Sequence, residues 1–277
     1  MHLLASLASL LTLAASADVV QAQTKSWFKP KAGTTFLWSL ESQIPVSPKS
    51  SSGLPLNFEV YDVDLFDTTA QQIKTYHDQG KKVFCYFSAG SLEPWRSDVK
   101  AFNSTCYCNK GSRCKMDGWD EWWLDLHSTS CITNVKSVMR KRLDLAKSKG
   151  CDGVEPDNVD SYTNNAGFGT TLQDQYNYLY FLGVSAHNRN LSIALKNSPD
   201  MIDRKPAVVN LFDAVVIEEC AKYNECASYA PFAKANKAVW QVEYEVSKVT
   251  CPIPGFFAMA YSSYSVNYKN VRDYCPK

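Results

Sequence analysis

Residues 150–162 read Gly-Cys-Asp-Gly-Val-Glu-Pro-Asp-Asn-Val-Asp-Ser-Tyr, and this stretch decides the fold prediction. It follows a run rich in basic residues, 133–149, and a glycine after such a run is typical of a helix end. Side chains alternate between the faces of a strand, so Gly153, Glu155 and Asp157 share one face. Two acids at the end of a strand are costly in a core and useful in a site. We therefore expect a helix, then a short strand ending in functional carboxylates, rather than an ordinary acidic turn.

Strands alternate with helices on both sides of this stretch, which predicts βαβ units and a parallel sheet. The other expected strands are 34–40, 58–64, 82–89, 122–126, 191–196, 214–218, 239–243 and 256–260, and the expected helices are 69–79, 133–149, 172–188 and 229–236. The length suits one TIM-like (β/α)8 barrel. Nine strands are expected where a closed barrel has eight, so one is an extra strand or a wrong assignment.

The N-terminal residues predict export. Residues 3–17 are apolar or small, without an acid or base, and end in Ala15-Ser16-Ala17, which fits a cleavage site. The run is too short for a comfortable transmembrane span, and no later segment is long enough for one. We expect a signal peptide at 1–17, a linker at 18–33 and one catalytic domain at 34–277, giving a secreted, soluble and monomeric protein.

Cysteines and charge limit the classes of function. The ten cysteines and the sequons at Asn103 and Asn190 suit a secreted glycoprotein. Most cysteines are expected to form disulfides that link loops. Cys85 and Cys151 lie in or beside expected strands and are either free thiols or a disulfide-bonded pair. The net charge is +1 and the basic residues are spread along the chain, which argues against nucleic acid as a partner.

Polar side chains recur at the ends of the expected strands. The carboxyl ends of all strands in a (β/α)8 barrel meet at one mouth, where active sites lie. Carboxyl groups from two strands are typical of a glycosidase active site. One carboxyl must donate a proton to the leaving oxygen, while the other attacks the sugar or activates water. The residues expected at this mouth are Asp62, Asp64, Tyr86, Ser88, Glu155, Asp157, Asn158, Asp160, Lys196, Asn197, Glu218, Gln241 and Glu243.

Aromatic residues near the expected mouth have two interpretations. They would stack on sugar rings, although a large aromatic on a strand more often fills the core. The residues concerned are Trp38, Tyr61, Tyr86, Trp95, Tyr162, Tyr244 and Tyr261.

Four blocks, taken in order, resemble glycoside hydrolase family 114. They are residues 83–91 with Trp95-Arg96, residues 150–160, Ala194-Leu195-Lys196-Asn197, and Glu218-Glu219-Cys220 with residues 223–226. The resemblance implies a TIM-barrel-like fold and a secreted endo-α-1,4-polygalactosaminidase acting on deacetylated stretches of galactosaminogalactan. It also implies a catalytic Asp and Glu, which fall on Asp157 and Glu218.

The physical interpretation agrees with this resemblance. Galactosamine is cationic, so an acidic cleft attracts it, and Asp62, Asp64, Glu155, Asp160 and Glu243 would pair with ammonium groups. We assign Asp157 as the nucleophile and Glu218 as the general acid/base of a retaining mechanism. Glu155 and Glu219 are the rival candidates. Lys196 either keeps the nucleophile ionised or extends its ammonium group toward solvent.

Other functions stay open or are disfavoured. A non-catalytic carbohydrate-binding barrel and a glycosidase for another α-linked or amino-sugar polymer remain alternatives. We expect no metal and no cofactor, because the histidines, His2, His77, His127 and His187, do not form a metal-binding pattern. The chain also lacks the Gly-x-Ser-x-Gly elbow of serine hydrolases.

Overall fold

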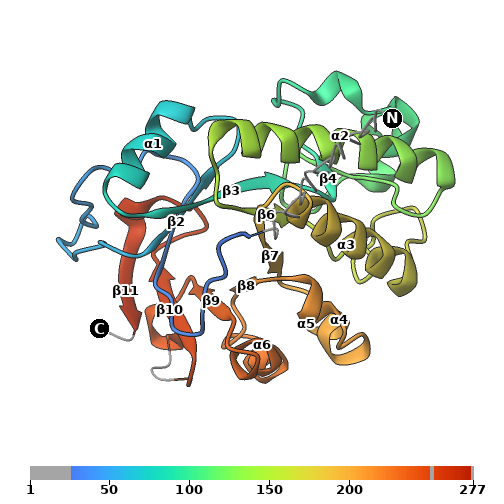
Figure 1. Ribbon diagram of the computed structural model, residues 1–277. Helices are drawn as coiled ribbons and strands as arrows, with labels where there is room; N and C mark the ends of the chain where they lie inside the picture. The colour runs from blue at the N-terminus through green and yellow to red at the C-terminus, as the bar shows by residue number, and fades with distance from the viewer. Residues whose placement is uncertain (1–25, 250–252, 276–277) are drawn as a thin grey trace, which may run out of the picture.

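A curled nine-stranded sheet is the centre of the computed structural model, which describes residues 26–249 and 253–275 (Figure 1). Its strands pair in the order β1-β2-β3-β6-β7-β8-β9-β10-β11. All neighbours are parallel except β11, which is antiparallel to β10. The predicted TIM-like architecture is confirmed. The expected signal peptide lies outside the described residues.

The strands of this sheet are short and almost entirely buried, apart from β11 at its edge. Their bounds are β1 (Phe36–Ser39), β2 (Val60–Asp64), β3 (Lys82–Ser88), β6 (Gly153–Asp157), β7 (Ser192–Lys196), β8 (Ala214–Glu218), β9 (Ala238–Glu243), β10 (Phe256–Tyr261) and β11 (Val271–Cys275).

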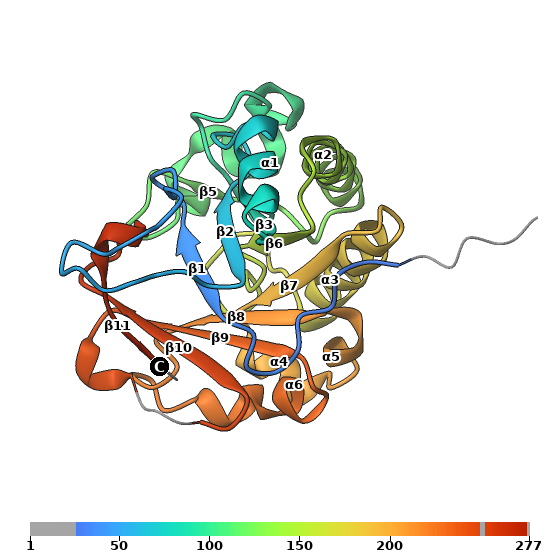
Figure 2. The ribbon, with the colours of Figure 1, turned by 60° about the vertical axis from the view of Figure 1, so that its left-hand side comes forward.

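Helices lie outside the curl, as Figure 2 shows. The α-helices are α1 (Ala70–Asp78), α2 (Thr129–Lys149), α3 (Leu172–His187), α4 (Pro199–Arg204), α5 (Val208–Leu211) and α6 (Ala230–Lys234). Short 3₁₀ turns occupy Val99–Ala101, Ser104–Lys110, Ser112–Cys114, Cys226–Tyr229, Val246–Lys248 and Tyr268–Asn270. Within the described ranges, none of the helices has both the length and the apolar character that crossing a bilayer requires.

The surplus strand of the sequence prediction is the one expected at 122–126. Only Trp122–Trp123 is extended, as β5, and it pairs with β4 (Ser91–Leu92) in a separate two-stranded sheet. The prediction of a barrel strand there was wrong, because two tryptophans in a loop imitate the aromatic pattern of a strand. The final strand β11 was not expected.

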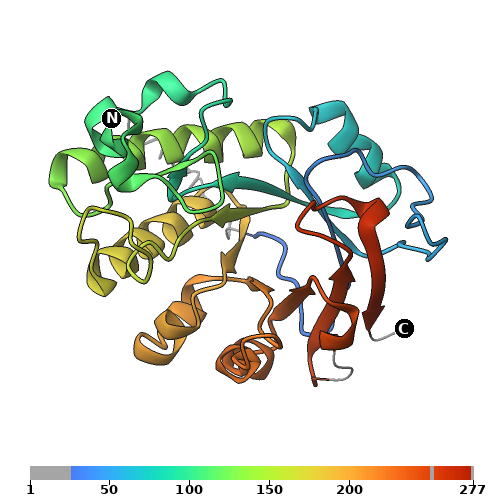
Figure 3. The same ribbon diagram turned by 180° about the vertical axis from the view of Figure 1, so that it is seen from behind.

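The two ends of the curled sheet meet through loops and side chains. Leu40, which follows β1, donates its backbone N–H to the carbonyl of Val266 at 2.9 Å, and the Tyr261 hydroxyl of β10 donates to the carbonyl of Trp38. The view from behind shows the β10–β11 end and the segments that surround it (Figure 3). These contacts bring the ends of β1 and β10 to the same mouth.

The sequence between α2 and β6 explains the local geometry. Gly150 ends α2 with a φ of 93°, in the left-handed region that glycine adopts without strain. Gly153 must be small, because a Cβ there would lie 2.5 Å from the Phe84 ring. The β6–β7 ladder stops at Val154, two residues before Pro156, which has no N–H to donate. The backbone at the end of β6 is therefore paired only with β3 in the sheet.

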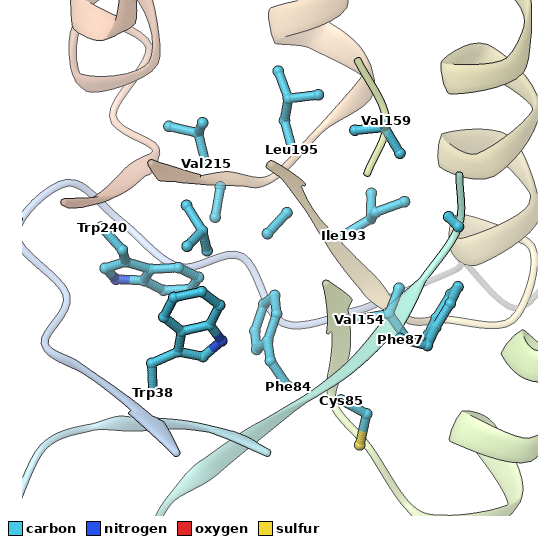
Figure 4. Packing of buried hydrophobic residues seen from close by; sticks show 14 of the residues in the cluster. Trp38, Phe84, Cys85, Phe87, Val154, Val159, Ile193, Leu195, Val215 and Trp240 are labelled. Atoms are coloured by element: carbon cyan, nitrogen blue, oxygen red, sulfur yellow. The ribbon is translucent and has the colours of Figure 1, made fainter. Parts of the chain in front are cut away.

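Large aromatic side chains fill the barrel below the mouth. Trp38, Phe84 and Trp240 gather inside the curl (Figure 4). Phe36 stacks on Trp240 with ring centroids 4.5 Å apart, and Phe84 meets the same indole edge-on at 5.3 Å. The barrel interior is consequently a packed core, and the polar residues at the strand ends lie above a floor of aromatic rings.

Disulfides fasten the loops and one pair of strands. Cys85 of β3 is bonded to Cys151 before β6, so the pair alternative of the sequence analysis is the correct one. The other disulfides among the described residues are Cys106–Cys131, Cys108–Cys114 and Cys220–Cys226. Cys251 lies outside the described residues.

Removal of the Cys85–Cys151 disulfide tests its contribution to stability. The bond joins residues 66 positions apart, and the entropy of closing such a loop predicts a loss of about 4 kcal/mol when both cysteines become alanine. Thermal unfolding of the Cys85→Ala/Cys151→Ala protein should show a lower Tm. The matched control is Cys220→Ala/Cys226→Ala, whose separation of 6 residues predicts a smaller loss. An unchanged Tm in the first variant would contradict the prediction.

Candidate active site

Two carboxylates and one lysine form the centre of the mouth. Asp157 ends β6, Glu218 ends β8, and Lys196 ends β7 between them. The Lys196 ammonium lies 3.0 Å from Asp157 Oδ1 and 2.9 Å from Glu218 Oε2. Because both oxygens contact the same nitrogen, they are at most about 6 Å apart. A lysine therefore fixes the separation of the acids.

Lys196 is a buried charge, with 3% of its surface exposed. Burial alone lowers the pKa of a lysine, but the charges of Asp157, Glu218 and Glu155 outweigh it, and the pKa of Lys196 lies well above its ordinary value. The ammonium also lies 4.9 Å from the centroid of the Trp38 ring. Lys196 is therefore the charge partner of the acids and does not extend toward solvent.

Hydroxyl and amide donors hold each carboxylate from its other side. Tyr86 on β3 donates to Asp157 Oδ2 at 3.0 Å. Tyr244, which follows β9, donates to Glu218 Oε1. Asn197 accepts from the Glu218 backbone N–H at 2.8 Å, and this fixes the end of β8 against the end of β7. Both carboxylates are thus held by groups from neighbouring strands.

The residues that follow β6, β7 and β8 all have left-handed backbones. Asn158, Asn197 and Glu219 have φ values of 60°, 49° and 56°. Such conformations cluster at sites where the chain must turn sharply. The turn directs Glu219 away from Lys196, because its carboxylate accepts from Lys222 at 2.7 Å and from the hydroxyl of Tyr264. Of the two adjacent glutamates, only Glu218 contacts the central lysine.

Two further acids are buried beneath Asp157. Asp62 and Glu155 are both fully buried, and Glu155 accepts from the Trp38 indole at 2.9 Å. Burial is the largest effect and raises the pKa of both carboxyls, that of Asp62 to about 7. Glu155 is therefore a buried neighbour of the site and does not line either cavity described below.

Two cavities meet at Glu218. The first cavity, of about 520 Å³, contains Asp157, Glu218 and Lys196 together with Glu121 and exposed tryptophans. The second cavity, of about 500 Å³, lies beyond Glu218 and is lined by further acids and tyrosines. Lining residues of the second cavity include Asp160, Asn197, Asp200, Glu219, Tyr223 and Glu225. Asp157 lines only the first cavity, whereas Glu218 lines both.

Paired acids at the mouth of a barrel are compatible with many glycosidases, and comparison with known proteins defines the family. A family model described as Glycoside-hydrolase family GH114 matches residues 16–275. The chain belongs to this family. It is therefore a glycoside hydrolase of family 114.

Solved structures support the assignment to family 114. The crystal structure of Aspergillus fumigatus Ega3 in complex with galactosamine is 34% identical, covers 91% of this chain and 99% of the Ega3 chain, and has a TM-score of 0.76. The glycoside hydrolase domain of PelA from Pseudomonas aeruginosa is 12% identical, covers 85% of this chain and 96% of its own, and has a TM-score of 0.58, which shows a shared fold. A comparison with curated proteins finds no match.

The structure brings most of the sequence-predicted residues of this family 114 enzyme to the mouth. Asp157, Glu218, Tyr86, Asn158 and Lys196 line the first cavity. Asp160 and Asn197 line the second. Burial raises the pKa of Asp160 to about 6, and the charge of Asp157 adds to this effect.

Four predicted positions have other surroundings. Asp64 lies at the first cavity, but both its oxygens accept from Arg96, so it is not free to bind an ammonium group. Ser88 is buried and hydrogen-bonded to Ser91. Gln241 and Glu243 are buried and bonded to each other, outside both cavities. These last two occupy the strand face opposite to Trp240 and Tyr244.

The sequence analysis missed several residues of the site, among them Trp119, Glu121 and Tyr244. Tyr244 was named only as an aromatic near the mouth, although the alternation along β9 identifies it once Trp240 is known to point inward. Glu121 was not named at all. It lies in a turn after Gly118, where no periodic pattern indicates the direction of a side chain.

One group of metal-ligand residue types occurs among the described residues. Cys220, Cys226 and Glu243 have ligand atoms within 4.8 Å of one another. The two cysteines are joined in a disulfide, so neither offers the thiolate that a metal ion needs. The donor set does not fit a metal centre.

Glu121 makes the stability of this family 114 enzyme depend on pH. Burial raises its pKa from 4.5 to about 7; the Ser91 hydroxyl opposes this shift, and the charges of Glu93 and Asp157 add to it. Between pH 4.5 and 7 the folded state keeps a proton that the unfolded state has lost, so the free energy of unfolding falls as pH rises. This fall should be about 3 kcal/mol and should be absent from Glu121→Gln.

Denaturant unfolding at several pH values between 4 and 8, with the disulfides intact, measures how the free energy of unfolding changes with pH in the wild type and in Glu121→Gln. Glu59→Gln is the control, since Glu59 is exposed and precedes β2 at the opposite end of the barrel. A constant difference in unfolding free energy between the wild type and Glu121→Gln over this range would show that Glu121 does not hold the proton.

Proposed function

We propose that this family 114 enzyme is secreted and cleaves internal α-1,4-galactosaminidic bonds in galactosamine-rich polysaccharide of the galactosaminogalactan type. The observation that carries the proposal is the pair Asp157 and Glu218, held at one buried lysine between two open cavities. The substrate is supported by Ega3, which is 34% identical and was solved with galactosamine. Cavities open on both sides of the pair suit cleavage inside a chain.

Asp157 acts as the nucleophile in this proposal, and Glu218 as the acid/base. Asp157 attacks the anomeric carbon while the bond to the leaving oxygen breaks and Glu218 protonates that oxygen. Glu218 then takes a proton from water, the water oxygen bonds to the anomeric carbon, and the Asp157 carboxylate leaves. The Lys196 ammonium lies 3.0 Å from the attacking carboxylate, and Tyr86 and Tyr244 keep both groups oriented.

The spacing of the acids supports retention of configuration. Their nearest oxygens are at most about 6 Å apart, close to the roughly 5–5.5 Å of retaining enzymes and below the roughly 6.5–9.5 Å of inverting ones. The first product released from an α-linked substrate should therefore be the α-anomer. Proton NMR during the first minutes of digestion identifies the anomer that is released first. An initial β-anomer would refute retention.

Export is supported by the chemistry of the chain surface. The described disulfides are typical of oxidising compartments. Both sequon asparagines, Asn103 and Asn190, are exposed and accessible to glycosylation.

Digestion of defined polymers tests the function. The wild-type protein should release oligosaccharides from deacetylated galactosaminogalactan, detected by mass spectrometry, and little from a fully N-acetylated or a neutral glucan. Products of several lengths at early times would indicate internal cleavage. Products only from the neutral glucan would overturn the proposal.

A further inference from the structure

The first cavity contains more carboxylates than the two that do the chemistry. An acid that is already paired with a basic residue attracts a cationic sugar only weakly. The partner of each acid therefore decides whether it can bind the substrate. The carboxylate residues lining the first cavity are Glu41, Asp64, Asp67, Glu93, Glu121, Asp157 and Glu218.

Arginines and the central lysine neutralise four of these seven. Arg96 is 2.5 Å from Asp64 and 2.7 Å from Glu93, and Arg142 lies 3.8 Å from the second oxygen of Glu93. Lys196 binds both catalytic acids, as described above. Each of the four therefore has a basic residue within 4 Å, although Glu93 Oε2 accepts no hydrogen bond among the described residues.

Two of the remaining three acids are open to solvent. Asp67 lies 3.7 Å from Arg96, but its side chain is 80% exposed. Glu41 is exposed and accepts from Ser265. Water screens both, so each attracts a bound cation only weakly.

Glu121 is different, because it is buried and lacks a cationic partner among the described residues. Only 6% of its surface is exposed. One oxygen, Oε2, accepts from the Ser91 hydroxyl, and the structure gives Oε1 no hydrogen-bond donor within the described ranges. A carboxylate oxygen that has no protein donor, on a residue that lines the cavity, can accept a hydrogen bond from a bound ligand. Burial, with the charges of Glu93 and Asp157, raises the pKa of Glu121 to about 7.

Two exposed tryptophans line the same cavity. Trp95 is 57% exposed and Trp119 is 54% exposed, which is unusual for side chains of this size. Exposed indole faces stack on sugar rings, whose C–H faces are apolar. The cavity thus offers aromatic surfaces for a ring and one incomplete carboxyl for a polar substituent of that ring.

Building on the proposed function, we propose that Glu121 is the specificity-determining residue that receives the ammonium group of galactosamine on the glycone side of the scissile bond. The side follows from the geometry, because the cavity that holds Glu121 also holds the nucleophile Asp157. The sugar attacked by Asp157 and its glycone-side neighbours must occupy that cavity, and the second cavity receives the aglycone.

An N-acetylated sugar would bind poorly beside Glu121. Its amide is neutral and larger, so the ionised form of Glu121 would be desolvated without gaining a cation. A galactosamine ammonium instead forms a charge-assisted hydrogen bond with Oε1. Discrimination against the acetylated sugar is therefore expected on the glycone side.

The test compares the wild type with Glu121→Gln, which keeps the shape of the side chain and an acceptor for Ser91. Substrates are an α-1,4-linked galactosamine hexasaccharide and its partially N-acetylated counterpart. For the deacetylated substrate, kcat/KM should fall about 10- to 100-fold, chiefly through KM, while the value for the acetylated substrate stays level or rises. Mass spectrometry should show acetylated sugars newly accepted among the two residues at the new reducing end.

Glu59→Gln is the matched control and should keep wild-type selectivity. An equal fall for both substrates would mean that Glu121 only supports the fold, and would overturn the inference, as would unchanged selectivity. If Glu121→Gln fails to fold, Glu121→Leu makes the same comparison without a buried polar group. Failure of the wild type to cleave either oligosaccharide would instead refute the proposed function.

Discussion

Replacing Asp157 by asparagine is expected to reduce kcat at least about 10³-fold while leaving the protein folded. The amide cannot form the glycosyl ester, and it loses the charge that Lys196 stabilises at 3.0 Å. Glu218→Gln should reduce kcat about 10²- to 10⁴-fold, the range for loss of a general acid/base. Release of oligosaccharides from deacetylated galactosamine polymer measures both effects, with near-UV circular dichroism as the test of folding.

Alanine variants at the same two positions separate the roles. With azide present, Glu218→Ala should form an α-glycosyl azide, because azide attacks the covalent intermediate on Asp157 and restores the configuration. Asp157→Ala should instead form the β-azide, because azide replaces the nucleophile. Asp160→Asn and Glu219→Gln are comparison variants, since within the described residues neither Asp160 nor Glu219 forms an ion pair or hydrogen bond with Lys196. Near-wild-type kcat in Asp157→Asn or Glu218→Gln would remove that residue from the mechanism.

Replacing Lys196 by methionine is expected to lower both activity and stability. The substitution leaves Asp157 and Glu218 side by side without their shared cation, and breaking a buried ion pair in this way costs roughly 3–5 kcal/mol. The pKa of Lys196 is raised on folding, so its contribution is fully present at pH 7 and is lost only as pH rises through the folded-state pKa. We expect kcat to fall at least about 100-fold, because the acids lose their fixed separation.

Lys74→Met is the matched control for this substitution. Lys74 pairs with Asp78 at 2.7 Å on α1, but its side chain is 63% exposed, so the loss should be about 0–1 kcal/mol. Denaturant unfolding at pH 7 and initial-rate kinetics give the two measurements. Similar values for the Lys196 and Lys74 variants would show that Lys196 is not the partner of the catalytic acids.

Much of the barrel was predictable because its signals are local. Helix ends, capping residues and runs of buried strand residues depend on neighbours in the sequence, as Gly150 after α2 illustrates. The wrong strand at 122–126 had the same cause, since Trp122 and Trp123 satisfy a local pattern for strands while pairing outside the main sheet.

A site residue was predictable where the pattern of a single strand shows which way its side chain points. Asp157 and Glu218 end their strands and face the mouth, as the alternation along each strand indicates. On β9 the same reasoning chose Gln241 and Glu243, because the face that turns inward depends on the pairing with β8 and β10. That pairing places Trp240 inside, and Tyr244 then follows at the mouth.

The amino-acid order by itself determined the alternating strands and helices, the acids at the strand ends and the family resemblance. Only the tertiary structure decided which acid has which partner. Lys196 lies between Asp157 and Glu218, Arg96 neutralises Asp64, and within the described ranges no basic side chain forms an ion pair with Glu121. These differences depend on distances of a few ångströms between side chains from separate strands and loops, and electrostatic interactions change steeply over such distances. The spacing of residues in the sequence does not give those distances. Carboxylates that look alike in the sequence therefore have different partners in the folded barrel.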